Sequence, residues 1–378
     1  MGFASWMSRM PTVKDTLGVD TSQLGLLILA LASGSIAGLV LSAPVIGKVG
    51  SQRVMAACLV LAAAGLLTAG VGVSLLGNFV VTAVGLVAFG SGMAMCDVAM
   101  NLSGAVNERM IGRTLMPLFH AFFSIGTMLG AAIGAACEHF GVPIATQSIG
   151  IAAIIAIAGV AAVRMTQSEV SANAADHAEH TAAIPRRSLW LDPKTMLIGL
   201  IVLGMAFAEG AADDWLALAV VEGHNVSKTQ GALVFGIFVT AMTAGRLGGG
   251  FVLDRFGRVP VLRACAASAA AGLLLFIFVP NPAIAVVGVV LWGLGASLGF
   301  PAGMSAAADD PTNATARVSV VATIGYLAFL AGPPAIGFLG HEVGLLKALL
   351  LVLALVVLAG ILSQAAREPA SPSPKQIA

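Results

Sequence analysis

Several acidic residues of this 378-residue chain lie inside runs that are otherwise apolar. Asp97 stands in GMAMCDVAMN, and Glu209 stands in AEGAADDW. A carboxyl group at the depth of a lipid bilayer costs free energy unless it faces a cavity or a partner. A group held there could bind a proton from one side of a membrane and release it to the other. We therefore expect Asp97 and Glu209 to couple protons to transport. Packing against a neighbouring helix is the alternative.

Two further polar residues are expected near Asp97. Asn101 follows it by four residues, which puts both on one face of a helix, and its amide could hydrogen-bond a hydroxyl group of a solute. His120 is expected at a similar depth on the next helix. Because histidine titrates near neutral pH, His120 could relay a proton with Asp97. A packing role for His120 fits the sequence equally well.

The remaining candidate binding residues lie in the second half of the chain. Asp213 falls one helical turn from Glu209 on the same face, which favours contact with a solute. Trp215 and Trp292 could stack on a sugar ring, although tryptophan at membrane depth is more often a core or interfacial residue. Tyr326 could line a cavity or serve packing.

Composition places these residues in a membrane. The chain is 58% hydrophobic and only 10% charged, whereas about 25% of a soluble protein is charged. Many apolar runs approach the roughly 20 residues that a spanning helix needs. Eleven such helices are predicted, at residues 24–46, 54–75, 79–106, 114–137, 142–163, 195–220, 229–251, 259–279, 283–307, 318–339 and 344–364.

Other function classes find little support. A net charge of +1 gives no reason to expect nucleic acid as a partner. The four cysteines lie in apolar segments without a C-x-x-C pair, and we interpret them as core residues. The patch DHAEH at 176–180 could bind a metal, but a solvated linker is the preferred interpretation. No spacing typical of a nucleophile and its base occurs, so we expect neither an enzyme nor a cofactor or metal site.

Polar breaks divide the chain into segments. Residues 164–194 form the one long polar break, near the midpoint. The prediction is an N-terminal bundle over 1–163, a cytoplasmic linker over 164–194, a C-terminal bundle over 195–364 and a disordered tail over 365–378. Residues 1–10 rise only about 15 Å as a helix, about half of a bilayer core. Either the true start lies upstream or the first helix is cut short.

An internal repeat relates the two halves. GLVLSAPVIGKVGSQRV (38–54) matches GRLGGGFVLDRFGRVPV (245–261), so that Gly50 corresponds to Gly257. GLVAFGSGMA (85–94) matches GVVLWGLGAS (288–297) at nearly the same offset. Two halves of like topology are typical of transporters with a site between the halves.

The stretch GGGFVLDRFGR resembles the cytoplasmic-loop signature of the major facilitator superfamily, G-x-x-x-D-R-x-G-R. The resemblance implies that Asp254, Arg255, Gly257 and Arg258 latch the two halves together on the cytoplasmic side. In the degenerate first copy, Lys48 keeps the charge and Gly50 keeps the turn. We group Arg246, two turns into the bilayer from Asp254, with these gating residues. We expect Arg246 to pair with an acid or with carbonyl groups.

A narrower resemblance covers three further runs. Residues 96–131 look like helices four and five of the fucose-permease-like branch, in which an acid at the place of Asp97 is implicated in proton coupling. Residues 208–220 and 325–337 look like bacterial inner-membrane proteins that include a rhizopine-uptake protein. The implied fold is an all-α membrane protein with the major facilitator fold. It has two six-helix bundles around a central cavity, with the first helix truncated.

The function expected from residues and resemblance together is secondary active transport. The protein would be a proton symporter for a small polar solute, such as a sugar, polyol or inositol derivative. It would work by alternating access as a monomer in the bacterial cytoplasmic (inner) membrane, with its linker and C-terminus cytoplasmic. Its partners would be the solute, protons and the lipid bilayer. One alternative is a proton-coupled exporter of drugs or metabolites, although GTMLGAAIG lacks the proline typical of exporters. The other is a membrane sensor or scaffold, which the short tails disfavour.

Overall fold

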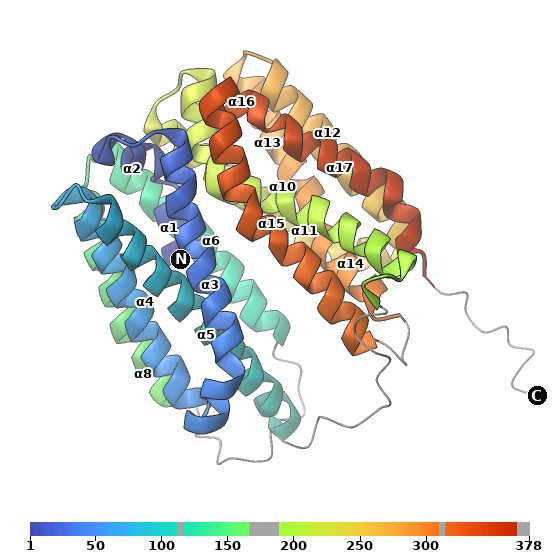
Figure 1. The fold of residues 1–378 in the computed structure, drawn as a ribbon, viewed down its shortest axis with the longest axis horizontal. Coiled ribbons are helices and arrows are strands. Elements are labelled where there is room, and N and C mark those ends of the chain that lie inside the picture. Colours follow the sequence, from blue (N-terminus) through green and yellow to red (C-terminus); the bar gives the residue numbers. More distant parts are fainter. Residues whose placement is uncertain (112–115, 166–188, 310–313, 369–378) are drawn as a thin grey trace, which may run out of the picture. The chain divides into compact units, whose positions relative to one another are not determined.

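Helices make up nearly all of the computed structural model, which describes residues 1–111, 116–165, 189–309 and 314–368 and has no strand in these ranges (Figure 1). The first half contains α1 (Gly2–Met7), α2 (Met10–Leu17), α3 (Thr21–Val49), α4 (Ser51–Ser74), α5 (Phe79–Ile111), α6 (Met116–His139), α7 (Ile144–Ile154), the π-helical turn η1 (Ile155–Gly159) and α8 (Val160–Met165). The second half contains α10 (Pro193–His224), α11 (Lys228–Phe256), α12 (Arg258–Phe278), α13 (Pro282–Ala296), α14 (Gly299–Ala307), α15 (Ala314–Val343), α16 (Leu345–Ala348), α17 (Leu350–Leu362) and the 3-10 turn η2 (Ser363–Ala366).

Most described residues of each of the eleven predicted runs are helical in the structure, so the helical prediction is confirmed. Two runs are interrupted, because α13 ends at Ala296 before α14 begins at Gly299, and α16 is separated from α17 at Leu349. Within the described ranges, 10 helical segments are long and apolar enough to cross a membrane.

The short N-terminal stretch forms two helices. The chain turns between α1 and α2 at Ser8 and Arg9, and α2 ends at Gly18, whose φ of 63° is left-handed. Asp20 then caps α3 through a capping box with Gln23. Hydrogen bonds from the Ser22 hydroxyl and the Gln23 amide stabilise the carboxylate and lower the pKa of Asp20.

The chain packs as two units. Unit 1 consists of Met1–Glu179, Ala212–Val239 and Pro333–Ala348, and unit 2 consists of His180–Ala211, Thr240–Gly332 and Leu349–Ala378. Two segments from the second half of the sequence therefore belong to unit 1. The contact of α3 with α15 within unit 1 is close, since a Cβ atom at Gly337 would lie 3.0 Å from Thr21 O.

The repeated motif has the same backbone conformation in both copies. Gly50 joins α3 to α4 with φ 87° and ψ 150°, and Gly257 joins α11 to α12 with φ 77° and ψ 164°. Only glycine adopts this region readily. The glycine that the sequence repeat aligns is therefore the residue that each junction requires.

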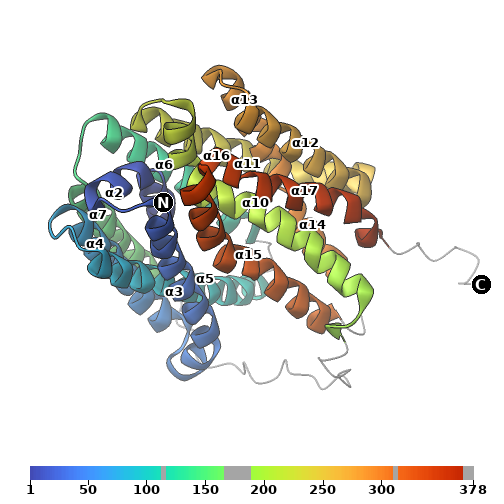
Figure 2. The ribbon, with the colours of Figure 1, turned by 45° about the horizontal axis from the view of Figure 1, so that its top comes forward.

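The repeat extends to a helix crossing in each unit. In unit 1, α4 packs on α5, and a Cβ atom at Gly92 would lie 2.7 Å from both Ala62 N and Cys58 O. In unit 2, α12 lies beside α13 (Figure 2), and a Cβ atom at Gly295 would lie 2.4 Å from Ala269 N and 2.5 Å from Cys265 O. The cysteines thus line equivalent crossings, where their small size fits the close approach.

Candidate functional site

The central ionic contact of unit 2 joins two membrane-length helices. Glu209 lies near the middle of α10 and Arg246 in the C-terminal half of α11. Arg246 Nη2 donates to Glu209 Oε1 at 2.7 Å, and Arg246 Nε lies 3.4 Å from Ser297 O. Arg246 therefore pairs with an acid and a carbonyl, as the sequence predicts. The acid is the residue that we expect to couple protons.

Contacts with α13 and with the residues after it position the helices α10 and α11, which bear Glu209 and Arg246. Trp292 Nε1 donates to Ala208 O at 3.1 Å, which ties α13 to α10 next to Glu209. A Cβ atom at Gly245 would lie 2.4 Å from Ser297 Oγ, so α11 closely approaches the interruption between α13 and α14. Interrupted helices recur at binding sites of transporters because their backbone groups become available to ligands.

Charges at this depth are costly. An arginine at the centre of a spanning helix costs about 2.5–3.5 kcal/mol on insertion scales, and intramembrane ionisable residues are therefore functional-site candidates by default. The Arg246 side chain is 36% exposed and that of Glu209 only 14%. The guanidinium group is thus the more accessible partner.

Asp97 lies on a cavity wall in unit 1. The cavity has a volume of about 320 Å³, and its lining includes Leu31, Phe89, Gly90, Met93 and Asp97. Gly90 and Asp97 share one face of α5, as their spacing predicts. The side chain of Asp97 is exposed, and nearly all of its neighbours in the wall are apolar.

The structure describes the side chain of Asn101 but not that of His120. Asn101 lies one turn beyond Asp97 on α5, and its Oδ1 is buried without a hydrogen-bond partner. That oxygen could accept a hydrogen bond from a solute hydroxyl. His120 belongs to α6, but its side chain lies outside the described part of the structure. The predicted relay with Asp97 stays a prediction.

The other predicted binding residues differ in how far their side chains are exposed. Asp213 is half-buried and the adjacent Asp214 is 9% exposed. Trp215 and Trp292 have no exposed surface, so contact with a solute would require the helices around either ring to move. Tyr326 is 43% exposed and lies near Phe300 in unit 2.

Of the predicted gating residues, Arg258 makes the best-defined contacts. Its Nη1 lies 2.8 and 2.7 Å from the two carboxylate oxygens of Asp309, and its backbone N–H donates to Glu368 at 3.0 Å. Sequence reasoning missed both acids, since Asp309 and Glu368 are distant in the chain. Asp254 and Arg255 are exposed, and no described residue forms an ion pair with either. Lys48 is also exposed, at the end of α3.

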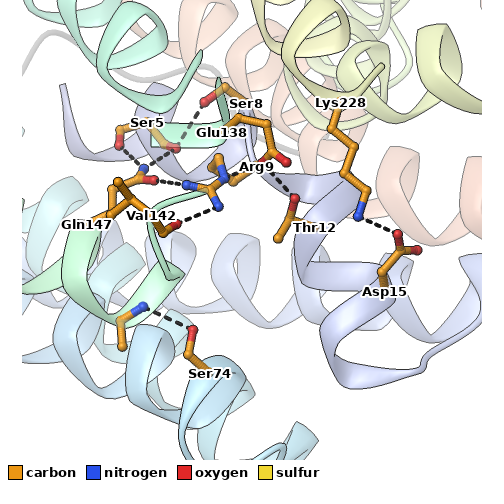
Figure 3. Close-up of polar contacts among 11 residues, drawn as sticks. Ser5, Ser8, Arg9, Thr12, Asp15, Ser74, Glu138, Val142, Gln147 and Lys228 are labelled. Carbon is orange, nitrogen blue, oxygen red and sulfur yellow. Dashed lines mark hydrogen bonds and ion pairs between the residues drawn. The ribbon is translucent and has the colours of Figure 1, made fainter. Parts of the chain in front are cut away.

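A buried polar network at the N-terminal helices was also missed (Figure 3). Arg9 is 2% exposed. Its guanidinium group donates to Gln147 Oε1 at 2.6 Å and to Val142 O at 2.9 Å, and its Nε lies 2.5 Å from Glu138 Oε2. Thr12 also donates to Glu138, and Gln147 donates to Ser5. The signal was the interruption of an apolar stretch by Arg9, but its partners are remote in sequence.

Two more ion pairs of unit 1 connect α2 with segments from the second half of the chain. Lys228 Nζ lies 2.5 Å from Asp15 Oδ2 (Figure 3), and Lys14 pairs with Glu222. Asp15 is 63% exposed in its side chain, so this pair is largely hydrated. These contacts join α2 to the end of α10 and the start of α11.

A metal site has no support in the described residues, where no group of three or more His, Cys, Asp or Glu side chains could hold an ion. The DHAEH patch at 176–180 lies outside the described residues.

Known proteins resemble this chain over nearly its full length. An uncharacterised MFS-type transporter of Yersinia pestis is 31% identical over 343 residues, covering 90% of this chain and 86% of that protein. Membrane protein MosC of Rhizobium meliloti is 27% identical over 358 residues, covering 94% of this chain and 84% of that protein.

Solved structures share the fold at low sequence identity. The nucleoside transporter NupG superposes with a TM-score of 0.75 at 14% identity, covering 97% of this chain and 95% of that chain. A variant of the Escherichia coli fucose:proton symporter FucP gives 0.60 at 16% identity, covering 97% of each chain. The family model of the Major Facilitator Superfamily matches residues 1–218 and 210–377. The chain therefore belongs to the Major Facilitator Superfamily and is an integral membrane protein with the all-α transporter fold.

Proposed function

We propose that this transporter is a proton symporter for a small polar solute such as a sugar, polyol or inositol derivative. The observation that carries the proposal is the Glu209–Arg246 ion pair between two spanning helices. A carboxyl group with a nearby cation can alternate between a paired, ionised form and a released, protonated form. That exchange is what coupling a solute to a proton requires.

Asp97 would be the second protonation site. Its position on a cavity wall, one turn from the unpartnered Asn101 oxygen, supports solute and proton binding on the same helix. The energy is adequate, because one charge crossing 100 mV releases about 2.3 kcal/mol, enough for roughly a fifty-fold solute gradient.

The proposed organisation follows from the repeat. The proposed halves are residues 1–163 and 195–364, joined by the linker 164–194 and followed by the tail 365–378. In the structure, Ala212–Val239 and Pro333–Ala348 of the second half pack with unit 1. The protein lies in the bacterial inner membrane with the Gly50 and Gly257 junctions on the cytoplasmic side. Of the 19 lysine and arginine residues, all but Arg9, Lys14, Lys228 and Lys347 fall on that side when the predicted spans alternate, which supports this orientation. The Asp15–Lys228 and Lys14–Glu222 pairs would then lie at the opposite, outer end.

The test is solute binding followed by transport. The purified protein is screened by thermal shift against a carbohydrate and polyol library at two pH values. Any stabilising solute is then offered to proteoliposomes with an imposed proton gradient. We expect gradient-driven accumulation by the wild type and by Glu342→Gln, an exposed control, and its loss in Asp97→Asn. Equal accumulation by wild type and Asp97→Asn would remove Asp97 from the mechanism.

Export by the same fold is the second candidate. The observation that favours it is the apolar lining of the cavity beside Asp97, which suits a greasy compound. A deletion strain that becomes sensitive to a panel of toxic compounds, yet grows normally on every carbon source, would make export the better interpretation.

A further inference from the structure

We propose that Arg246 binds an anionic group of the transported solute, and that Glu209 occupies this position while no solute is bound. This inference rests on the proposed transport function and narrows its substrate class to solutes that carry a carboxylate or a similar monoanionic group, such as a sugar acid.

The first argument is the geometry of the ion pair. Arg246 contacts Glu209 through a hydrogen bond of 2.7 Å, from one nitrogen to one oxygen. Arg258, in contrast, holds both carboxylate oxygens of Asp309 in the same unit. The strongest arrangement of an arginine and a carboxylate is bidentate, with two guanidinium nitrogens each donating to one carboxylate oxygen. The contact between Glu209 and Arg246 lacks this arrangement, which favours its exchange for another anion.

The second argument is accessibility. The Arg246 side chain is 36% exposed, whereas the Arg258 side chain is 17% exposed and that of Arg9 only 3%. Among these three arginines, all of which pair with acids, Arg246 has the most exposed side chain.

The third argument is the interrupted helix beside Arg246. The α13 helix ends at Ala296, and Ser297 O, at this end, faces Arg246 Nε. The α11 backbone is held against the interruption at Gly245. Arg246 is thus positioned by the backbone independently of Glu209, so that loss of the Glu209 contact need not displace the guanidinium group.

Displacement accounts for proton coupling with balanced charge. The solute anion replaces the Glu209 carboxylate on Arg246. Glu209, now without a cation at membrane depth, takes one proton from the water on the side from which the solute entered. The anion and the proton on Glu209 therefore enter together without net charge, and the charge that the membrane potential drives is the second proton, on Asp97. Release of the solute on the other side returns Glu209 to Arg246 and frees the proton there.

The experiment uses the purified full-length protein and small anions as probes. Glu209→Gln keeps the volume of the side chain and removes the Glu209 carboxylate from the contact with Arg246. We expect sodium propionate to raise the melting temperature of Glu209→Gln more than sodium chloride at equal ionic strength. Half of the effect should come at a concentration at least about ten-fold lower than for wild type, which is the effect of removing a competing ligand. The double variant Glu209→Gln/Arg246→Gln should respond to both salts equally.

A folded Glu209→Gln variant that responds equally to propionate and chloride would overturn the inference. If this variant does not fold, the wild type provides the test. Methanesulfonate should stabilise the wild type more than chloride at equal ionic strength, and Arg246→Gln should abolish this difference. An equal response of the wild type to both salts would overturn the inference.

The two proposals fail in different ways. Proton-driven accumulation of a neutral polyol that is unchanged in Arg246→Gln would overturn the anion site and leave the transport proposal standing. Specific propionate binding without proton-driven accumulation of any solute would refute symport and leave the anion site standing.

Discussion

The buried pair of Arg9 and Glu138 allows a double-mutant cycle whose outcome follows from burial. The perturbation is replacement of Arg9 by Met, Glu138 by Met, or both. Methionine keeps much of the side-chain volume and removes the charge. The Arg9 side chain is 3% exposed and that of Glu138 is 12% exposed, so each single variant leaves its partner charged and nearly out of contact with water.

Breaking a buried ion pair by removing one partner costs about 3–5 kcal/mol, whereas replacing both partners with apolar residues is often nearly neutral. The double variant still loses the hydrogen bonds of Arg9 to Gln147 and Val142 and the hydrogen bond of Thr12 to Glu138, at about 0.5–1.5 kcal/mol each. We therefore expect the double variant to cost about 1.5–4.5 kcal/mol. The two single costs together should exceed this value by about 1.5 kcal/mol or more.

The assay is reversible unfolding in mixed detergent micelles, followed by tryptophan fluorescence, which needs no knowledge of the solute. The matched control is the cycle of Lys14→Met and Glu222→Met. The side chains of that pair are 18% and 37% exposed. Because water screens such a pair, its coupling should stay within about 1 kcal/mol.

Additive costs at Arg9 and Glu138, within about 0.5 kcal/mol, would refute the reasoning. Additivity would mean that the two charges do not depend on each other, and that water or other groups satisfy each one separately.

Three further predictions concern single features of the structure. Gly50→Ala should lower the free energy of unfolding by about 1–3 kcal/mol, because the φ of 87° and ψ of 150° at this residue suit only glycine. The control Gly47→Ala, with open space around its Cβ position, should not destabilise the protein. Equal melting temperatures of the two variants would contradict this prediction. Asp192→Asn should destabilise at pH 7, because the hydroxyl of the threonine three residues later lowers the pKa of Asp192 below its usual value. A lowered carboxyl pKa stabilises the fold above about pH 4, and this contribution is lost as pH falls through the folded-state pKa. The difference in melting temperature between Asp192→Asn and wild type should therefore shrink in acid. A difference that does not change with pH would show that the ionised Asp192 does not stabilise the fold in this way. Lys228→Asp should raise the rate at which a maleimide labels a cysteine introduced at the buried position of Leu24, because the Asp15–Lys228 ion pair no longer stabilises the packing there. The expected increase is about 1.4- to 5-fold, the range for an exposed ion pair. The charge swap with Asp15→Lys should restore the slow rate, and unchanged labelling in Lys228→Asp would show that the pair does not stabilise this packing.

Local features of the fold were predictable from the sequence because each depends on a few neighbouring residues. Long apolar runs predict membrane-length helices wherever they occur. The aligned glycines at 50 and 257 predict two similar helix junctions. A single glycine is enough to indicate each junction, because its backbone conformation is one that other residues rarely adopt.

The candidate site was predictable only in part. Membrane depth singled out Asp97, Glu209 and Arg246, because a charged residue in an apolar run is conspicuous without any structure. Residue type also selected Trp215 and Trp292, as rings that could stack on a sugar, and both are closed off from any solute in this structure. Residue type and depth cannot distinguish an aromatic ring that faces a cavity from one that faces a neighbouring helix, since both have the same sequence neighbours.

The sequence by itself determined that this protein spans a membrane, consists of two related halves and carries ionisable groups at membrane depth. Only the tertiary structure decided which charge meets which. Glu209 and Arg246 are 37 residues apart, and Arg258 and Asp309 are 51 residues apart. The physical reason is that an ion pair needs two atoms within about 3 Å, and such proximity is set by how whole helices pack and rotate against each other. Helix packing depends on many weak contacts at once, so no short pattern in the chain specifies it.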